Sequence, residues 1–332
     1  MYCKERIIFL LILLVLSFSI IISGCGIIQK KSDEVPTEQN APEIEEQETE
    51  ENAEDTRETI LYYQDNSGYL VPVMRRIKWE EGIARAALSK LIDSPEQQQE
   101  ILGMGLKPIL PANTQIHGIS IENGLAKVDF NSAAMEHPDA ISENNMVQGV
   151  VMTLAEFPTI DKVQFMFDGK IIDTLQYGTK VGTPIEPGNI NLELSHDSSG
   201  SGAEVTVFFH NTSSSNYEYL VPVTRITSNS IATIETAMEE LIRGPKAEGS
   251  LRLDIPANTK LLGVQMDEGI TYINFSEEFN QLKESASQDI VLRAITMTAK
   301  GYPEVEIVKI LVDGKEFESD ALLATPVFAN EY

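Results

Sequence analysis

Four histidines are the first residues to consider as catalytic bases or metal ligands: His117, His137, His196 and His210. Zinc sites typically place two histidines about three to five residues apart, or a histidine close to cysteine ligands. None of the four has such a neighbour in the sequence. His196 falls in a polar linker, and His210 follows two phenylalanines with no acidic residue beside it. We therefore interpret all four as ordinary core or surface histidines and expect no metal site.

Two short motifs resemble parts of known functional sites. Residues 137–139 read HPD, as in J-domain cochaperones, but they follow an expected β-hairpin and do not join two basic helices. Residues 103–107 read GMGLK, but a phosphate-binding P-loop requires Ser or Thr after its lysine, and Pro108 stands there. A GxSxG nucleophile motif is also absent from the sequence. We therefore expect neither a bound cofactor nor a catalytic nucleophile.

The N-terminus has the pattern of an export signal. Lys4 and Arg6 precede an apolar run over residues 7–22, and Ser23-Gly24-Cys25 follows. A basic segment, an apolar segment and small residues are typical of a secretory signal peptide, here residues 1–24. The small pair before Cys25 resembles the lipobox of bacterial lipoproteins, in which that cysteine is acylated. A plain transmembrane anchor is the alternative, although the run is shorter than the roughly 20 residues of a comfortable span.

The composition supports a lipid anchor outside the cytoplasm. Once a signal containing Cys3 is removed, Cys25 is the only cysteine left, so an intramolecular disulfide is excluded. Residues 25–57 are strongly acidic and poor in apolar residues, which predicts a disordered tether. The net charge of −26 argues against nucleic-acid binding and against electrostatic attraction to an anionic membrane. We therefore expect the lipid on Cys25 to hold the protein on the outer face of the cell membrane.

The rest of the chain is a tandem duplication. YLVPV at Tyr69–Val73 returns at Tyr219–Val223, an offset of 150 residues. PANT and DGK, which begin at Pro111 and Asp168, return at an offset of 145. One loop is therefore five residues shorter in the second copy. We place the two domains at residues 58–185 and 204–332, joined by a Ser/Gly-rich linker over residues 186–203, and expect each to have its own core.

Both copies give the same order of elements. A β-rich run and the YLVPV strand form a hairpin, in which Pro72 and Pro222 each lack an amide donor and so predict an edge or a bulge. A helix, a hairpin turning at glycine, a second helix near 145–157 or 289–302 and a final strand follow. The order β-β-α-β-β-α-β predicts an α+β fold, with two helices packed in a second layer on a mainly antiparallel sheet.

Aligning the two copies shows which acidic residues both of them carry, and these are the candidates for a shared catalytic group. Asp129 aligns with Asn274, so the second copy has no carboxylate there. Three acids do align, all at expected turns or strand ends: Glu122 with Asp267, Asp161 with Glu306, and Asp168 with Asp313. A structural role explains such positions. The copies therefore share apolar strands and turn residues but no recognisable reactive set, which predicts that the protein is not an enzyme.

These segments carry a resemblance to a known family. The stretches YLVPVTRI, LIRGP, IPANTKLLGV, GITYINFSEEF and VKILVDGKEF of the second copy are similar to one GerMN domain, and the first copy matches more loosely. Two such domains behind a lipoprotein signal resemble the GerM-like sporulation and germination lipoproteins of endospore-forming bacteria. The resemblance implies a non-enzymatic protein that helps to assemble a trans-envelope complex between mother cell and forespore. It also implies domains like the ring-building modules of secretion machinery.

Two functions from different classes therefore stay open. The first is a membrane-anchored scaffold that docks envelope or sporulation-complex proteins through a sheet edge. Arg75 and Arg225, aligned just beyond YLVPV, are its candidate contacts, with a surface ion pair as the alternative role. The second is a lipoprotein that binds peptidoglycan glycan or a small ligand. Four hairpin tyrosines would stack on the sugars, unless they pack across strands: Tyr62, Tyr63, Tyr217 and Tyr219.

Overall fold

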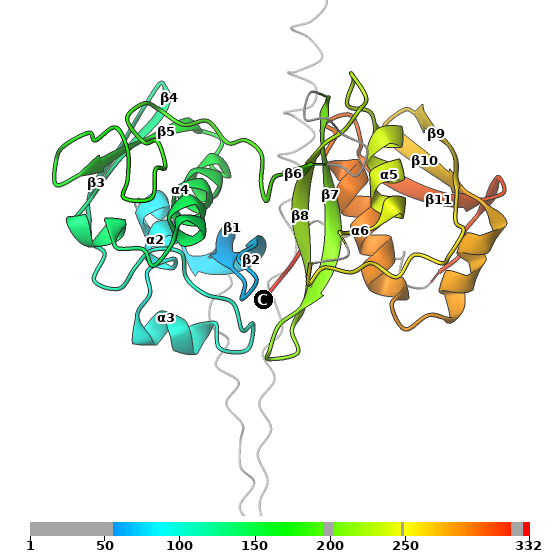
Figure 1. The fold of residues 1–332 in the computed structure, drawn as a ribbon, viewed down its shortest axis with the longest axis horizontal. Helices are drawn as coiled ribbons and strands as arrows, with labels where there is room; N and C mark the ends of the chain where they lie inside the picture. Colours follow the sequence, from blue (N-terminus) through cyan, green and yellow to red (C-terminus); the bar gives the residue numbers. More distant parts are fainter. Residues whose placement is uncertain (1–55, 81, 195–201, 247–248, 320–327) are drawn as a thin grey trace, which may run out of the picture. The chain divides into compact units, whose positions relative to one another are not determined.

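The first repeat contains the predicted elements and one additional helix. The computed structural model describes residues 56–80, 82–194, 202–246, 249–319 and 328–332, which belong to one contact unit. The elements of the first repeat are β1 (Thr56–Gln64), β2 (Leu70–Lys78), α2 (Ile83–Ser89), α3 (Pro95–Glu100), β3 (Ile116–Glu122), β4 (Gly124–Phe130), the 3-10 helix η2 (Ser132–Met135), α4 (Ala140–Ala155) and β5 (Ile160–Phe167) (Figure 1).

The second repeat has the same order, preceded by a short strand from the linker. Its elements are β6 (Glu193–Leu194), β7 (Glu204–Thr212), β8 (Glu218–Ile226), α5 (Ile234–Arg243), β9 (Leu261–Asp267), β10 (Ile270–Phe275), the 3-10 helix η3 (Glu277–Glu284), α6 (Gln288–Lys300), β11 (Ile307–Val312) and β12 (Lys315–Glu316). The predicted order of strands and helices is therefore confirmed in both copies.

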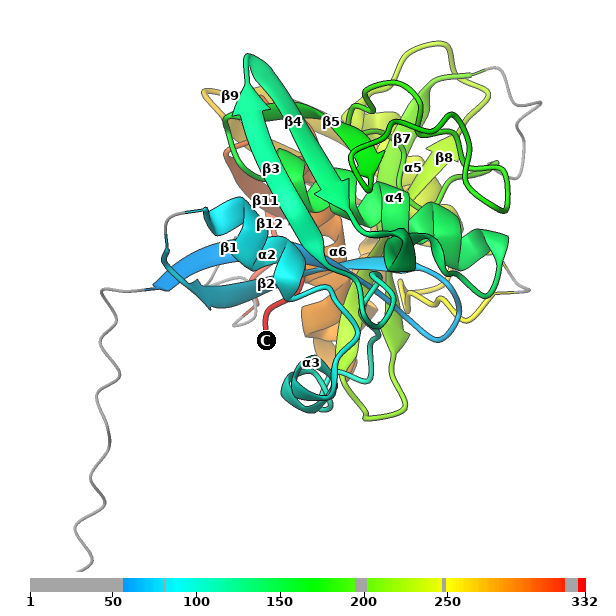
Figure 2. The same ribbon diagram turned by 90° about the vertical axis from the view of Figure 1, so that its left-hand side faces the viewer.

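The strands of each repeat form two sheets. The hairpin β1–β2 is one sheet, and β3-β4-β5 is the other; Figure 2 shows the long β3–β4 hairpin of the second sheet (Figure 2). In the second repeat the orders are β6-β8-β7 and β12-β11-β10-β9. The hairpins β1–β2 and β7–β8 are antiparallel, whereas the strand pairs β4–β5 and β10–β11 are parallel. Helix α4 packs against β1 and β5, and α6 packs against β7 and β11, so one long helix joins the two sheets of each repeat. The α+β prediction is confirmed.

Equivalent turns of the two repeats have the same backbone geometry. Asn113 and Asn258 both have φ of 65°, and Asp168 and Asp313 both have φ of 48°. Such left-handed positions favour Asn, Asp and Gly over other residues. The predicted glycine hairpin turn is also present, with φ of 77° at Gly124. The shared motifs of the sequence therefore mark positions that the backbone conformation restricts.

The Asp129/Asn274 substitution has a simple structural reason. The Oδ1 atom of Asp129 accepts the Gly169 amide at 2.9 Å, and Oδ1 of Asn274 accepts the Gly314 amide at 3.0 Å. A carboxylate and a side-chain amide both offer an oxygen acceptor. The position needs that oxygen and not a charge, which accounts for the loss of the carboxylate in the second copy.

An additional helix follows α2, and α4 begins earlier than predicted. Helix α2 ends at Ser89, and Pro95 begins the additional helix α3, with Ser94 Oγ accepting the Gln97 amide at 3.2 Å. Proline suits the first turn of a helix because its missing amide would be unpaired there anyway. Helix α4 begins at Ala140, earlier than predicted, because the carboxylate of Asp139 accepts the Ser142 amide at 2.7 Å.

Candidate functional site at the paired YLVPV strands

Several predicted features lie outside the described residues. These are the signal peptide, the lipid-attachment residue Cys25, His196 and all but the last residues of the acidic tether. Within the ranges that the structure describes, no helix is long and apolar enough to cross a bilayer. The lipid anchor therefore stays a prediction.

Two of the three described histidines, His137 and His210, make hydrogen bonds within the fold. The His117 Nδ1 lies 3.9 Å from a carboxylate oxygen of Asp129 and of Asp168. The His137 Nε2 atom lies 3.0 Å from the Ala134 carbonyl, and Asp139 of the same HPD motif caps α4. His210 is buried, with the Arg252 Nε donating to its Nδ1 at 3.4 Å. No group of three or more His, Cys, Asp or Glu side chains in the described part of the chain is arranged to hold a metal ion.

The buried carboxylate Glu143 also serves the fold. Burial acts to raise its pKa, but hydrogen bonds from the Tyr177 and Thr179 amides outweigh burial and lower the pKa. The two N···O distances are 2.8 and 3.0 Å. An ionised carboxylate held by two backbone amides fixes the loop after β5 against α4. Its acceptor oxygens are therefore already used within the protein.

The two YLVPV strands face each other across a buried contact between the repeats. Strands β2 and β8 are in direct contact. We call the described linker residues 186–194 the tail of the first repeat and residues 328–332 the tail of the second. The proline carbonyl of each strand accepts a hydrogen bond from an asparagine of one tail. Asn191, in the tail of the first repeat, accepts the Leu70 amide at 2.8 Å. Its Nδ2 donates to the carbonyls of Leu70 at 2.8 Å and Pro222 at 2.7 Å.

Asn330, in the tail of the second repeat, makes the same three bonds with the repeats exchanged. Its Oδ1 accepts the Leu220 amide at 2.7 Å, and its Nδ2 donates to the carbonyls of Leu220 at 2.8 Å and Pro72 at 2.7 Å. Leu70 and Leu220 are equivalent residues, as are Pro72 and Pro222. The contact therefore follows an approximate two-fold symmetry inside one chain.

Each tail also pairs with the hairpin of the other repeat, the first as the short strand β6 and the second through an isolated bridge. Glu193 of the first tail pairs in parallel with Arg225 on β8, and Glu331 of the second tail pairs in parallel with Met74 on β2. The Met74 amide donates to the Asn330 carbonyl at 2.8 Å. The outer edges of both YLVPV strands are thus occupied by the protein's own chain, whereas the sequence predicted that they were open to a partner.

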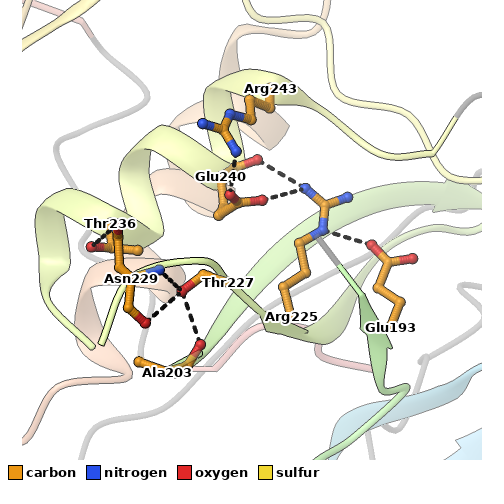
Figure 3. A network of polar contacts seen from close by, with 8 residues as sticks. All are labelled: Glu193, Ala203, Arg225, Thr227, Asn229, Thr236, Glu240 and Arg243. Carbon is orange, nitrogen blue, oxygen red and sulfur yellow. Dashed lines mark hydrogen bonds and ion pairs between the residues drawn. The ribbon is translucent and has the colours of Figure 1, made fainter. Parts of the chain in front are cut away.

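Arg225 is at the centre of a buried polar network, shown in Figure 3. Its Nε lies 2.6 Å from Glu193 Oε1, and its Nη1 lies 3.3 Å from Glu240 Oε2 (Figure 3). Its side chain is 0% exposed, and its guanidinium lies over the Phe209 ring at 4.8 Å. The network joins the tail strand β6 to helix α5 through β8. Arg225 therefore has neither the exposure of a partner contact nor that of a surface ion pair.

Arg75 has an equivalent position on β2 and a similar environment. Its Nη2 lies 2.7 Å from Glu100 Oε1, and its guanidinium lies 5.1 Å from the ring centroid of Tyr332, the C-terminal residue. Its side chain is 10% exposed. The structure thus gives both predicted arginines internal partners. That either one binds another protein stays a prediction, and it would require the tail to leave its hairpin first.

A buried carboxylate connects the hairpin turns of the two repeats. Asp65 is 1% exposed, and its Oδ2 accepts the Tyr219 hydroxyl and the Asn211 Nδ2, both at 3.0 Å. Its Oδ1 accepts the amides of Ser67 and Tyr69 within its own turn. Burial and the nearby Asp65 carboxylate both raise the pKa of Tyr219, so this hydroxyl remains a donor at neutral pH.

The tyrosines proposed for sugar stacking are packed internally. Tyr62, Tyr63 and Tyr219 are buried, and Tyr217 stacks on Tyr219 with ring centroids 5.8 Å apart. The Tyr217 hydroxyl also donates to the Glu331 carbonyl at 3.1 Å. The alternative of packing, which the sequence left open, describes all four residues in this structure.

The two asparagines were not identified from the sequence, although a signal is present. Asn191 follows Thr183-Pro184, and Asn330 follows Thr325-Pro326, so both copies place a Thr-Pro pair a few residues before the asparagine. The differing spacing hides the match in a fixed-offset alignment. The polar partners are backbone atoms of the other repeat, which no local pattern indicates.

Comparisons with known proteins agree with this architecture. A family model described as "Germane: Sporulation and spore germination" matches residues 60–173 and 206–318. The Spore germination protein GerM of Bacillus subtilis (strain 168) is 27% identical, and the match covers 90% of this chain and 89% of that protein. The solved structure of the tandem GerMN domains of GerM from Bacillus subtilis superposes with a TM-score of 0.70 at 27% identity, covering 83% of this chain and 99% of the solved one.

Proposed function

Because the chain belongs to the Germane family of sporulation and spore germination proteins, we propose that it is a lipid-anchored, non-enzymatic assembly protein of that process. Cys25 carries the anchor, and the acidic tether over residues 25–57 lets the two domains reach into the space between mother cell and forespore. There the domains support a trans-envelope complex by binding its protein subunits.

The observation that carries this proposal is the sheet order of the two repeats. Strands β3 and β9 each end their sheet, with a hydrogen-bonded neighbour on one side only among the described strands. Unpaired amides and carbonyls on such an edge are a template for a strand of another protein. Strands β1, β7 and β12 also end their sheets. Since the tails pair with the YLVPV strands, we place docking at β3 and β9, one edge in each repeat.

The composition of these edges suits a docking role. Leu262 and Met266 on β9 are 51% and 41% exposed, and Ile121 on β3 is 42% exposed. Exposed apolar side chains next to unpaired backbone groups favour strand addition.

The proposal is tested by recovering partners from solubilised envelopes of sporulating cells. Wild-type protein should recover subunits of an envelope complex, and the Leu262→Lys and Ile121→Lys variants should recover less while melting at the same temperature. Lysine on an edge strand opposes pairing with another strand. Cys25→Ala should move the protein out of the membrane fraction. Failure of the wild-type protein to recover any envelope subunit would contradict the assembly role, and unchanged recovery by both lysine variants would exclude these edges.

A further inference from the structure

A polar groove lies in the first repeat. It lies where the β1–β2 turn, helix α4 and the tail of the first repeat meet, and it encloses about 700 Å³. That volume falls within the range of small-molecule sites, roughly 300–1,000 Å³. The residues of interest in its lining are Tyr69, Asn144, Gln148, Glu186, Asn189 and Glu193.

The groove presents hydrogen-bonding groups that the protein itself does not use. Asn144 and Gln148 stand four residues apart on α4, so their side chains lie on one helix face. Among the described residues, neither amide has a hydrogen-bonding partner, and the same holds for Asn189 and for the hydroxyl of Tyr69. Four free polar groups thus point to a ligand that supplies both donors and acceptors.

The second repeat satisfies the equivalent positions internally. Asp289 and Arg293 replace Asn144 and Gln148 at the offset of 145 residues, and they form an ion pair at 2.6 Å. Tyr219 replaces Tyr69, and its hydroxyl donates to Asp65. The duplicated framework has therefore diverged at the groove, leaving free amides and a free hydroxyl in the first repeat only.

The chemistry of the lining selects the ligand class. The groove has no lysine or arginine among its described lining residues, while Glu186 and Glu193 and the net charge of −26 oppose a polyanion. The exposed apolar side chains of Ile141 and Leu192 would contact methyl groups or the C–H face of a sugar ring. A second cavity of about 560 Å³ adjoins the first, since both are lined by Ser67, Gly68 and Ile141. Its lining differs in charge, because it includes Lys107 together with Asp93, Glu136 and Asp139.

We propose that this groove binds an uncharged glycan strand of N-acetylated amino sugars, the chemistry of cell-wall glycan. The N-acetyl amides and ring hydroxyls pair with Asn144, Gln148 and Tyr69, while the acetyl methyl groups contact Ile141 and Leu192. The assembly role proposed above does not depend on this site.

The test is calorimetric titration of the full-length protein with a tetramer of N-acetylglucosamine. The double variant Asn144→Asp/Gln148→Arg introduces the ion pair of the second repeat, and it should weaken binding about tenfold because two hydrogen bonds to the sugar are lost. Tyr69→Phe should weaken binding by a smaller factor. The matched control, Asp289→Asn/Arg293→Gln in the second repeat, should bind like the wild type, and all variants should melt near the wild-type temperature.

The outcomes separate the ligand classes. Binding of the N-acetylated tetramer but not of its de-N-acetylated form supports the proposal, as does sedimentation with purified peptidoglycan that the double variant loses. Absence of binding by the wild-type protein overturns it. Equal binding by the wild type and the double variant, or binding of a free stem peptide in place of the glycan, also overturns it.

Discussion

At the scale of single residues, burial gives the two arginines beyond YLVPV a role in stability. From the sequence, Arg225 is a candidate contact for a partner protein, with a surface ion pair as the alternative. In the structure its guanidinium is enclosed between Glu193, Glu240 and the Phe209 ring. Removing one partner of a buried ion pair leaves the other charges uncompensated, which is strongly destabilising.

We therefore expect Arg225→Glu to lower the free energy of unfolding by about 3–5 kcal/mol. The matched control is Arg76→Glu, because Arg76 pairs with Glu58 at 3.2 Å on the surface and its side chain is 70% exposed. Exposed pairs contribute about 0–1 kcal/mol, so the control should stay near the wild type. Urea denaturation measures both values. Equal stability of the two variants would contradict the role given to the buried network.

His210 gives the fold a dependence on pH. Burial lowers its pKa, and the Arg252 guanidinium beside it lowers the pKa further, from an ordinary value of 6.5. The unfolded chain therefore binds a proton at His210 near pH 6.5, whereas the folded protein binds it only at a lower pH. The stabilisation is present above that pH and is lost as the pH falls toward the lower pKa of the folded state.

We expect the free energy of unfolding to decrease between about pH 7.5 and pH 5.5, and His210→Gln to reduce that decrease. Burial also lowers the pKa of His137, so part of the dependence should remain in the variant. Urea titrations at a series of pH values measure how the free energy of unfolding changes with pH. Near pH 8 the histidine is neutral in both states, so a difference between variant and wild type at that pH reports a loss of packing. An unchanged slope in the variant would show that His210 does not contribute.

At the scale of elements, the tails hold the two hairpins together. Each tail places one asparagine against a leucine amide and carbonyl of its own repeat and a proline carbonyl of the other. The asparagine side chain has both an acceptor oxygen and an amide donor, so it pairs with the leucine amide and also with the two carbonyls.

We expect Asn330→Ala to lower the free energy of unfolding by about 1–3 kcal/mol, because it leaves the buried Leu220 amide without its partner. Asn191→Ala should have an effect of similar size, since its bonds are equivalent. Asn189→Ala is the control, because that side chain is exposed and close in sequence. Denaturant curves compare the three variants. If Asn189→Ala lowers the free energy of unfolding as much as Asn330→Ala does, the stabilising role given to the two tail asparagines is contradicted.

At the scale of the whole molecule, the exchanged tails make the repeats depend on each other. The domain limits at residues 58–185 and 204–332 remain a prediction, but a fragment ending at residue 185 lacks Asn191. The fragment 204–332 keeps Asn330 but loses its Pro72 acceptor. Each repeat keeps its own buried strands and long helix, so an independent core is expected to survive.

We therefore expect each fragment to unfold in one cooperative thermal transition, at a lower temperature than the full-length protein. Extending the first fragment to residue 194 should restore part of the difference, because it returns Asn191 to the Leu70 amide. Differential scanning calorimetry of the three fragments and the whole protein measures this. A fragment that behaves as an unfolded chain would show that the repeats share one core and that the predicted boundary is wrong.

The sequence alone determined the duplication, the order of elements and the α+β class, because hydrophobic periodicity, turn residues and a repeated register are local properties. Asn123-Gly124 and the DGK turns are examples, since the left-handed backbone restricts which residues stand there. The tertiary structure decided which edges are covered and which charges are buried. Asn191, Asn330 and Arg225 find their partners across repeats or on distant elements, where residue type and spacing carry no information about distance. The sequence likewise did not indicate the free amides of Asn144 and Gln148 as a site, because that helix face lines a groove only once the tail of the first repeat packs beside it.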